Sequence, residues 1–315
     1  MQHGNKVKDA GFERSLVKKS DKHCGFIALV GRPNVGKSTL LNRLVKQKIS
    51  ITSRKPQTTR HRIAGIYEEG HYQFVFLDTP GLHRKKFSEM NRIMNKTAIR
   101  VLCESDVIVF MIEGEQWTKE DEWIKEKWIE TAKTPIILVI NKADKIKEKE
   151  KLLPIIEKLS KSACFKAIVP LSAKTGDNLE GLLNEIKRFL PKNSFFYSEG
   201  QITDRSERFL CAELIREKAM RLTGKEVPYA MTVEIESFKI KDKVTHIHAI
   251  LWVEKENQKG IIIGESGERL KKVGMQARLE MEKMLGNKVF LKLWCKVKSS
   301  WSTDKRALQS LGYFD

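Results

Sequence analysis

The 315-residue sequence lacks long apolar runs, paired-cysteine motifs and low-complexity segments. Its longest apolar runs, at 107–112 and 135–140, are strand-sized and far below the ~18 residues needed to span a bilayer. The five cysteines are scattered, without a CxxC pair or a histidine at metal-ligand spacing, which predicts free thiols in a reducing compartment. Residues 1–23 contain no apolar signal region and mix acidic with basic side chains. We therefore expect a cytoplasmic protein with a flexible basic N-terminal arm.

Acidic residues are in deficit, because 59 lysines and arginines outnumber 40 aspartates and glutamates and give a net charge of +19. Such an excess predicts a polyanionic partner, either nucleic acid or an anionic membrane surface, although it also fits a merely soluble basic protein. The length favours about two domains. The hydrophobic content of 41% is sufficient for packed cores.

Between residues 24 and 190, short β-rich apolar runs alternate with helical segments such as 38–45 and 88–102. The runs lie at 26–30, 63–67, 72–77, 106–112, 136–140 and 167–171. This alternation predicts an α/β domain with a doubly wound, mainly parallel sheet. The turn between the second and third runs is too short for a crossover, so we expect these two strands to pair antiparallel.

The pattern changes after residue 191, where a polar segment broken by glycine is typical of a linker. The expected elements that follow are helix 206–222, strands 230–239 and 244–254, helices 259–263 and 268–285, and strand 289–297. Their order, α-β-β-α-α-β, predicts a smaller α+β domain. We divide the chain into an arm at 1–23, a first domain at 24–192, a linker at 193–205 and a second domain at 206–315.

The sequence GRPNVGKS at 31–38 matches the phosphate-binding pattern GxxxxGK[ST], and it lies between an apolar run and a helical segment, as the pattern requires. Glycines let the backbone wrap a phosphate, successive N–H groups form an anion-binding nest, and the helix N-terminus faces the same charge. We expect Lys37 to bridge the β- and γ-phosphates and the Ser38 hydroxyl to coordinate Mg²⁺. The pattern therefore predicts a P-loop domain.

Three further motifs each follow a predicted strand: DTPG at 78–81, NKAD at 141–144 and SAK at 172–174. Asp78 is placed to hold Mg²⁺ through water. The Asp144 carboxylate can accept two hydrogen bonds from guanine that adenine cannot offer. Each motif alone also fits an ordinary loop, but the four motifs in this order favour GTP. The predicted GTP-binding residues are Gly31, Arg32, Pro33, Asn34, Val35, Gly36, Lys37, Ser38, Thr39, Asp78, Thr79, Pro80, Gly81, Leu82, Asn141, Lys142, Asp144, Ser172, Ala173 and Lys174.

Two switch regions are expected around the γ-phosphate. The basic sequence KPQTTRHR at 55–62 has the position of a first switch, with an ordinary surface loop as the alternative. The second switch is expected from residue 81 to about residue 95. Leu82 stands where Ras-type GTPases place the glutamine that orients the attacking water. Leucine cannot do this, so intrinsic hydrolysis should be slow or use another stabilising group.

The second domain contains GESG at 264–267, between a short apolar helix and a longer charged one. A GxxG turn alone is weak evidence, because a plain helix–helix turn has the same composition. Its surroundings look like a type II KH domain, in which the glycines let the turn approach a sugar-phosphate backbone. Glu265 departs from the basic residues or glycine common at that position and would repel phosphate. The predicted RNA-binding residues are Lys259, Gly260, Gly264, Glu265, Ser266, Gly267, Arg269, Lys271 and Lys272.

Together, GRPNVGKS, KPQTTRHR, DTPGL, NKAD and SAK, followed by a KH-like domain with GIIIGESG, resemble the Era family of bacterial ribosome-assembly GTPases. The resemblance covers roughly residues 24–315. It implies a GTPase that binds GTP and GDP, binds small-subunit (16S) ribosomal RNA near its 3′ end, assists maturation of the 30S subunit and associates peripherally with the inner membrane. We expect a monomer.

The resemblance also assigns roles in catalysis. It favours Thr59 over Thr58 as the threonine that completes Mg²⁺ coordination, beside Ser38 and Asp78. Asn34 is similar to an asparagine whose carbonyl helps to ligate K⁺ in related GTPases, although a tolerant turn residue is the alternative. The predicted catalytic residues are Lys37, Thr59 and Asn34, with Mg²⁺ as the cofactor and K⁺ as a second candidate ion.

Two functions from other classes remain open. One is a GTP-dependent RNA-binding scaffold that hardly hydrolyses GTP, and the other is a membrane-surface regulator whose basic excess binds anionic lipid. Turnover with and without RNA tests the first, and liposome binding against competing RNA tests the second. A related GTPase acting on tRNA or large-subunit RNA usually lacks the α-β-β-α-α-β domain.

Overall fold

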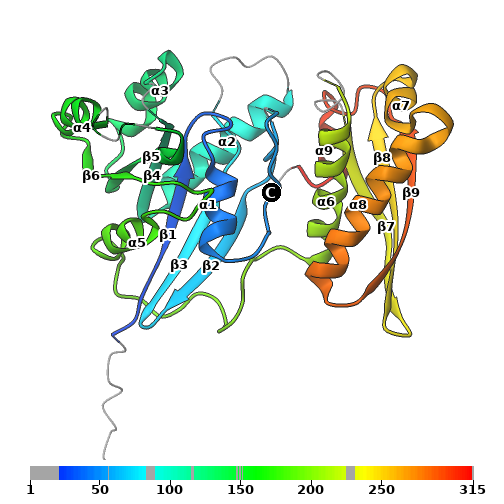
Figure 1. Cartoon of the computed structure of the whole chain (residues 1–315), viewed down its shortest axis with the longest axis horizontal. Coiled ribbons are helices and arrows are strands. Elements are labelled where there is room, and N and C mark those ends of the chain that lie inside the picture. Colours follow the sequence, from blue (N-terminus) through cyan, green and yellow to red (C-terminus); the bar gives the residue numbers. More distant parts are fainter. Residues whose placement is uncertain are drawn as a thin grey trace, which may run out of the picture.

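A computed structural model of the chain describes residues 21–55, 57–82, 89–114, 117–146, 148, 150, 152–224 and 231–313 (Figure 1). Most of the predicted N-terminal arm and part of the predicted second switch, residues 83–88, lie outside the described residues. The chain forms two lobes that lie side by side, with the carboxyl terminus between them.

The first lobe alternates strands and helices as the sequence predicts. Its strands are β1 (His23–Val30), β2 (Ile63–Glu69), β3 (Tyr72–Asp78), β4 (Val107–Glu113), β5 (Ile136–Asn141) and β6 (Phe165–Pro170). Its helices are α1 (Lys37–Leu44), α2 (Glu89–Glu104), α3 (Lys119–Ile124), the π-helix η1 (Lys125–Ile129), the 3₁₀ turn η2 (Ala143–Lys145), α4 (Leu152–Ser160) and α5 (Leu179–Lys187).

The six strands form one sheet in the order β2-β3-β1-β4-β5-β6. All neighbours are parallel except β2 and β3, which pair antiparallel with Ile63 opposite Asp78, so this prediction is confirmed. Helices cover both faces, and β4 is accordingly buried along almost its whole length. Strands β3 and β4 lie on opposite sides of β1, so a crevice opens at the carboxyl ends of these strands, where α/β proteins bind ligands.

The second lobe has the predicted order and one further helix. Its elements are α6 (Glu207–Leu222), β7 (Met231–Lys241), β8 (Val244–Val253), α7 (Glu256–Ile263), the 3₁₀ turn η5 (Glu265–Gly267), α8 (Glu268–Leu285), β9 (Lys288–Val297) and α9 (Lys305–Ser310). The sheet order is β7-β8-β9, with β7 antiparallel and β9 parallel to β8. Helices α6, α7 and α8 share a hydrophobic core with one face of this sheet. The sequence analysis missed α9, because six residues give too short a period to recognise.

The predicted linker is docked against the first lobe rather than free. We call residues 192–205 the strap. The Ile66 N–H donates to the Ile202 carbonyl at 2.8 Å, and Thr203 forms a bridge with Gly65 on edge strand β2. Tyr197 packs against the core of the first lobe. Polar composition did not predict this docking, because the partners of the strap's backbone groups lie more than 100 residues away.

Candidate GTP-binding site

The P-loop connects β1 to α1 and has the backbone shape that a phosphate-binding loop needs. Gly36 adopts φ 111° immediately before α1, and a Cβ atom there would lie 2.1 Å from Asn141 Nδ2. Only glycine fits this position without displacing Asn141. The Lys37 ammonium turns back over the loop and donates to the carbonyls of Gly31 and Arg32, both at 3.1 Å.

Lys37 is a buried cation held mostly by neutral carbonyls. Burial lowers its pKa to about 8, although Asp78 acts in the opposite direction. A phosphate group in the loop would place negative charge beside this ammonium and raise its pKa again. The P-loop therefore holds a buried positive charge on Lys37 that a bound anion would stabilise.

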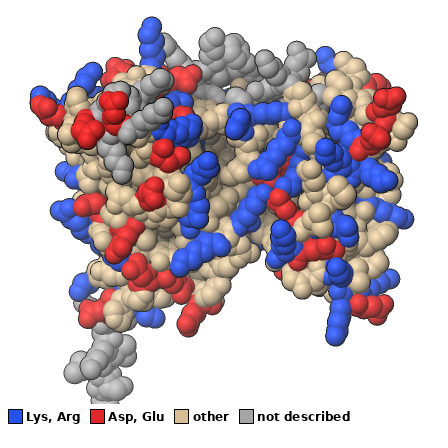
Figure 2. Space-filling model, viewed as in Figure 1, with Lys and Arg blue, Asp and Glu red and all other residues tan. Residues whose placement is uncertain are grey.

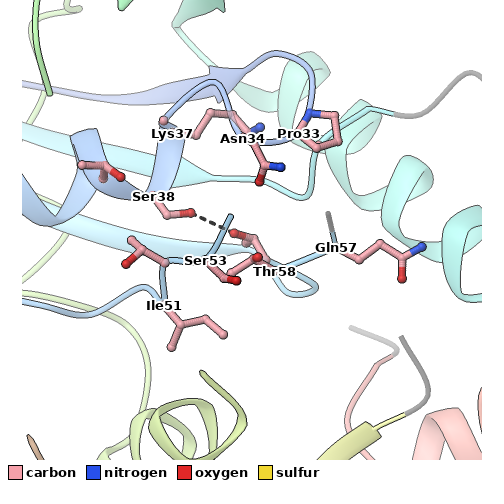
Figure 3. Close-up of a pocket in the computed structure, with 13 residues that line it drawn as sticks. Pro33, Asn34, Lys37, Ser38, Ile51, Ser53, Gln57 and Thr58 are labelled. Atoms are coloured by element: carbon pink, nitrogen blue, oxygen red, sulfur yellow. Dashed lines mark hydrogen bonds between the residues drawn. The ribbon is translucent and has the colours of Figure 1, made fainter. Parts of the chain in front are cut away.

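Hydroxyl oxygens converge beside the P-loop (Figure 3), and the Asp78 carboxylate lies within hydrogen-bond distance of them. The Ser38 hydroxyl donates to Asp78 Oδ2 at 2.6 Å and lies 2.8 Å from the Thr59 hydroxyl. Ser50 also donates to Asp78 Oδ2, at 2.8 Å, while the buried Oδ1 has no hydrogen-bond partner. Burial raises the pKa of Asp78, which is the expected cost of enclosing a carboxylate with only one cation, Lys37, nearby. An oxygen-only donor set with an unpartnered carboxylate oxygen fits Mg²⁺.

The NKAD and SAK loops, which the sequence predicts to contact the guanine base, are connected to the P-loop through Asn141. Its side-chain amide donates to the Val35 carbonyl at 2.7 Å, and its oxygen accepts the Ala173 N–H at 2.9 Å. The Asp144 carboxylate is exposed and accepts a hydrogen bond from Ser172 at 2.6 Å. The structure thus brings the four sequence motifs together at one edge of the sheet.

Several predicted GTP-binding residues direct their side chains elsewhere. Leu82 is buried in the core of the first lobe, and the Thr79 hydroxyl donates to the Leu29 carbonyl at 2.9 Å. Arg32 is held by Asp121 at 3.3 Å. Leu82, Thr79 and Arg32 can therefore contact a nucleotide through their backbone groups. Their side chains are already held in other contacts.

Asn34 is engaged on two sides. Its main-chain carbonyl accepts a hydrogen bond from Lys142 at 2.9 Å, and its side-chain amide donates to the Arg54 carbonyl at 2.9 Å. The same Lys142 ammonium pairs with Glu113 at 2.7 Å. Sequence reasoning missed Glu113 and Ser50, because neither belongs to a motif and both reach the site only through the fold.

The predicted first switch also contacts the second lobe. We call residues 48–62 the switch segment. Lys48 pairs with Glu217 of α6 at 2.5 Å and with Glu280 of α8 at 2.6 Å. The Thr52 N–H donates to Glu217 at 3.0 Å, and Arg216 of α6 donates to the carbonyl of Thr58. The segment therefore contacts Ser38 and Asp78 through Ser50 and Thr59, and it contacts helix α6 through Lys48, Thr52 and Thr58.

Aromatic and apolar contacts complete this interface. His61 stacks on Tyr313 with ring centroids 4.6 Å apart, and burial lowers the pKa of His61 to about 4. The side chains of Met94 in α2, Trp301 and Leu308 belong to one buried cluster with Tyr313. Lys and Arg side chains gather on both sides of the hollow between the lobes (Figure 2). Both predicted switch regions thus contact the second lobe.

The GxxG turn of the second lobe lies between α7 and α8. Gly264 has φ 74°, where a Cβ atom would lie 2.8 Å from the Cβ of Arg269, and Gly267 has φ 81°. The predicted basic residues Lys271 and Lys272 are exposed within the first two turns of α8. Glu265 is exposed as well, so its carboxylate has room to turn away from a bound phosphate.

The fold and the four converging motifs define a P-loop GTPase followed by a KH domain. A family profile described as 50S ribosome-binding GTPase matches residues 26–142, and a KH domain profile matches residues 226–302. GTPase Era of Histophilus somni strain 2336 is 50% identical over 303 residues, which cover 96% of this chain and 99% of that protein. GTPase Era of Marinobacter nauticus is 52% identical over 295 residues, 94% of this chain and 96% of that protein. The chain belongs to the Era family of GTPases.

Two solved structures agree with this assignment over nearly the whole chain. One is Era in complex with MgGDPNP and nucleotides 1506–1542 of 16S ribosomal RNA, with a TM-score of 0.89, 42% identity and coverage of 93% of this chain and 99% of that one. The other is a variant of Aquifex aeolicus Era bound to GDP·AlF4⁻, with a TM-score of 0.89, 42% identity and coverage of 92% and 99%. The predicted GTPase and KH folds are confirmed. Among the described helices, none combines the length and the apolar character needed to cross a membrane.

Proposed function

We propose that this GTPase binds small-subunit (16S) ribosomal RNA near its 3′ end in a GTP-dependent manner and assists maturation of the 30S subunit. One observation carries the proposal: the switch segment contacts the metal-binding oxygens through Thr59 and the RNA-binding lobe through Thr58 and Thr52. The identity of the RNA comes from the Era structure that contains nucleotides 1506–1542 of 16S RNA. The protein would act in the cytoplasm, with peripheral inner-membrane association as the resemblance implies.

The site residues have distinct roles in this proposal. Lys37 and the P-loop N–H groups hold the β- and γ-phosphates, and Asp144 reads guanine through its exposed carboxylate. Ser38, Thr59 and Asp78 hold Mg²⁺, which neutralises charge on the phosphates when it is bound. Residue 82 is a leucine whose side chain is buried in the core, so it cannot orient the attacking water as a glutamine would. Intrinsic hydrolysis is therefore slow.

K⁺ is the proposed source of additional positive charge during hydrolysis. The Asn34 main-chain carbonyl already accepts a hydrogen bond from Lys142, so its side-chain oxygen is the better candidate ligand. Hydrolysis should be faster in K⁺ buffer than in Na⁺ buffer, and Asn34→Ala should remove the difference. Equal rates in the two salts would exclude this role.

The proposed coupling between nucleotide binding and RNA binding follows from the switch segment, which contacts both the P-loop side and the KH lobe. Thr59 would help to hold Mg²⁺ in the GTP state, and any shift of Thr59 between nucleotide states would move the adjacent Thr58 carbonyl and change its contact with Arg216. The docked position of the KH lobe then depends on the nucleotide.

The test measures affinity of the full-length protein for a 16S fragment spanning nucleotides 1506–1542, with GDP and with a nonhydrolysable GTP analogue. We expect at least tenfold tighter binding with the analogue. A large-subunit RNA of equal length is the matched control, since one matching family is described as 50S ribosome-binding. Equal affinities in the two nucleotide states, or preference for the large-subunit RNA, would contradict the proposal.

A further inference from the structure

The KH sheet has an open face with an alternating sequence of cations and rings. Strand β9 sends alternate side chains inward, where Val289 and Cys295 join the core under α8. The intervening side chains point to the opposite face: Lys288, Phe290, Lys292, Trp294 and Lys296. Phe290 and Trp294 are 44% and 40% exposed, which is unusual for large apolar side chains on a strand.

Each of these rings is supported by an imidazole on the neighbouring strand. His246 of β8 lies opposite Phe290, with ring centroids 5.3 Å apart. His248 meets Trp294 edge to face at 5.7 Å. The supporting contacts fix both rings while leaving them exposed, and the two rings lie about 13 Å apart along the strand at ~3.3 Å per residue. Lys292 lies between them.

Two acidic residues of this face, Glu234 and Glu236, belong to β7, which lies at the opposite edge of the sheet from β9. Glu234 of β7 accepts a hydrogen bond from Trp252 at 2.8 Å, and Glu236 lies 3.9 Å from Lys296. Lys298 lies over the Trp252 ring at 5.8 Å. The outward-facing charged side chains of β9 itself are all lysines; Lys296 is paired with Glu236, and Lys288 and Lys292 flank Phe290 along the strand.

We propose that the open face of β8 and β9 is a second RNA-binding surface, on which unpaired bases stack on Phe290 and Trp294 while the β9 lysines contact phosphates. Exposed rings interleaved with cations on a sheet are the features by which proteins bind single strands with little sequence preference. The GxxG turn lies with α7 and α8, which cover the opposite face, so this surface is distinct from the predicted KH site. The inference rests on the proposed RNA-binding function. It extends the surface along which a longer RNA would bind.

A lipid surface is a poorer match to the same residues. Amphipathic membrane-binding surfaces separate a charged face from an apolar one, so that the apolar face enters the acyl boundary. On β9 each ring has a lysine two residues away on either side, and burying both rings would carry Lys292 with them. A flexible polyanion can instead place bases and phosphates alternately along the strand.

The experiment uses the full-length protein with a GTP analogue and two fluorescent RNAs, a 6-nucleotide and a 30-nucleotide oligouridine. The variant Phe290→Ala/Trp294→Ala should weaken binding of the 30-mer at least tenfold and leave the 6-mer unchanged, because the short RNA fits the GxxG groove alone. Phe196→Ala, which removes a 41% exposed ring from the first lobe, is the matched control and should change neither affinity. Ultraviolet crosslinking should place uridine on the β9 peptide of the wild type.

The outcomes separate this inference from the proposed function. Unchanged 30-mer affinity in the double variant, with 6-mer binding intact, overturns the second surface but not RNA binding. Failure of the wild type to bind the 16S fragment would reject the proposed function itself. Phosphatidylglycerol vesicles that bind the wild type but not the double variant, and resist competing RNA, would assign the face to lipid and overturn the inference. Unaltered GTP affinity and melting temperature verify that the variants fold.

Discussion

Asp144 is the residue on which we expect nucleotide choice to depend. Its carboxylate is exposed at the rim of the site and is held in place by Ser172 at 2.6 Å. A carboxylate accepts hydrogen bonds only, which matches the ring N–H and exocyclic amine of guanine. Neither contact exists for adenine.

Asp144→Asn should therefore change the preferred base. The amide offers a donor where guanine also presents donors, so GTP affinity should fall at least tenfold while affinity for xanthosine triphosphate rises. Competition binding against a fluorescent nucleotide measures both. Asp177→Asn, a nearby exposed carboxylate held by Thr175 at 2.7 Å, is the control, and an equal loss there would reject the assignment.

Lys37 should make nucleotide affinity depend on pH. Burial lowers its pKa to about 8 in the free protein, and phosphate raises it, so affinity is full below pH 8 and declines as pH rises through that value. Between pH 7 and pH 8.8 the dissociation constant for GDP should increase roughly sixfold. Isothermal titration measures this change. Lys37→Ala should bind weakly with no such dependence, and a parallel pH slope in that variant would assign the effect to another group.

At the scale of elements, helix α6 stands out because four of its charged residues are buried: Glu213, Arg216, Glu217 and Lys218. Glu217 is fully buried and accepts hydrogen bonds from Lys48, Arg221 and the Thr52 N–H. The switch segment thus contacts a helix of the other lobe through a fully enclosed carboxylate. Such a pair is costly to break on one side only, because the partner charge stays behind.

Glu217→Gln should loosen this interface. Buried Lys218 and the partly exposed Lys48 and Arg221 lose one counter-charge, and we expect a loss of about 3 kcal/mol in the free energy of unfolding, measured by urea titration. The ratio of RNA affinities in the GTP and GDP states should approach one. Glu185→Gln, which removes an exposed pair with Arg188, should change neither quantity. Full nucleotide dependence in Glu217→Gln would disprove coupling through α6.

The elements also show what sequence patterns can and cannot predict. The P-loop, Asp78 and Asn141 were predictable because each motif lies at a strand end, where the chain alone fixes the local geometry. The contact between Thr52 and Glu217 was not, since the two residues are 165 positions apart and neither carries a motif. The sequence also did not predict that the strap docks on β2 or that α9 packs in the cluster with α2. No local sequence period reveals a partner that lies far along the chain.

For the whole molecule, Trp301 connects the two lobes. It is fully buried with Met90, Ile93 and Met94 of α2, although it follows the last strand of the KH sheet. Trp301→Ala should destabilise this contact by roughly 3–5 kcal/mol. Calorimetry should then show two unfolding transitions where the wild type shows one. Trp294→Ala, which truncates an exposed ring, should keep a single transition, and a single transition in Trp301→Ala as well would mean that the lobes do not depend on this contact.

The strap determines how far the lobes can separate. It stays attached to β2 as far as Asp204, which accepts from Arg62 at 2.7 Å, and α6 begins only three residues later. If the KH lobe undocked, the strap would keep it at an effective local concentration in the millimolar range. Redocking would be intramolecular. A nucleotide-dependent difference of about 1.4 kcal/mol in the free energy of docking would change the docked-to-undocked ratio tenfold. A short tether would thus let a modest change at the γ-phosphate control access to RNA, as the proposed coupling requires.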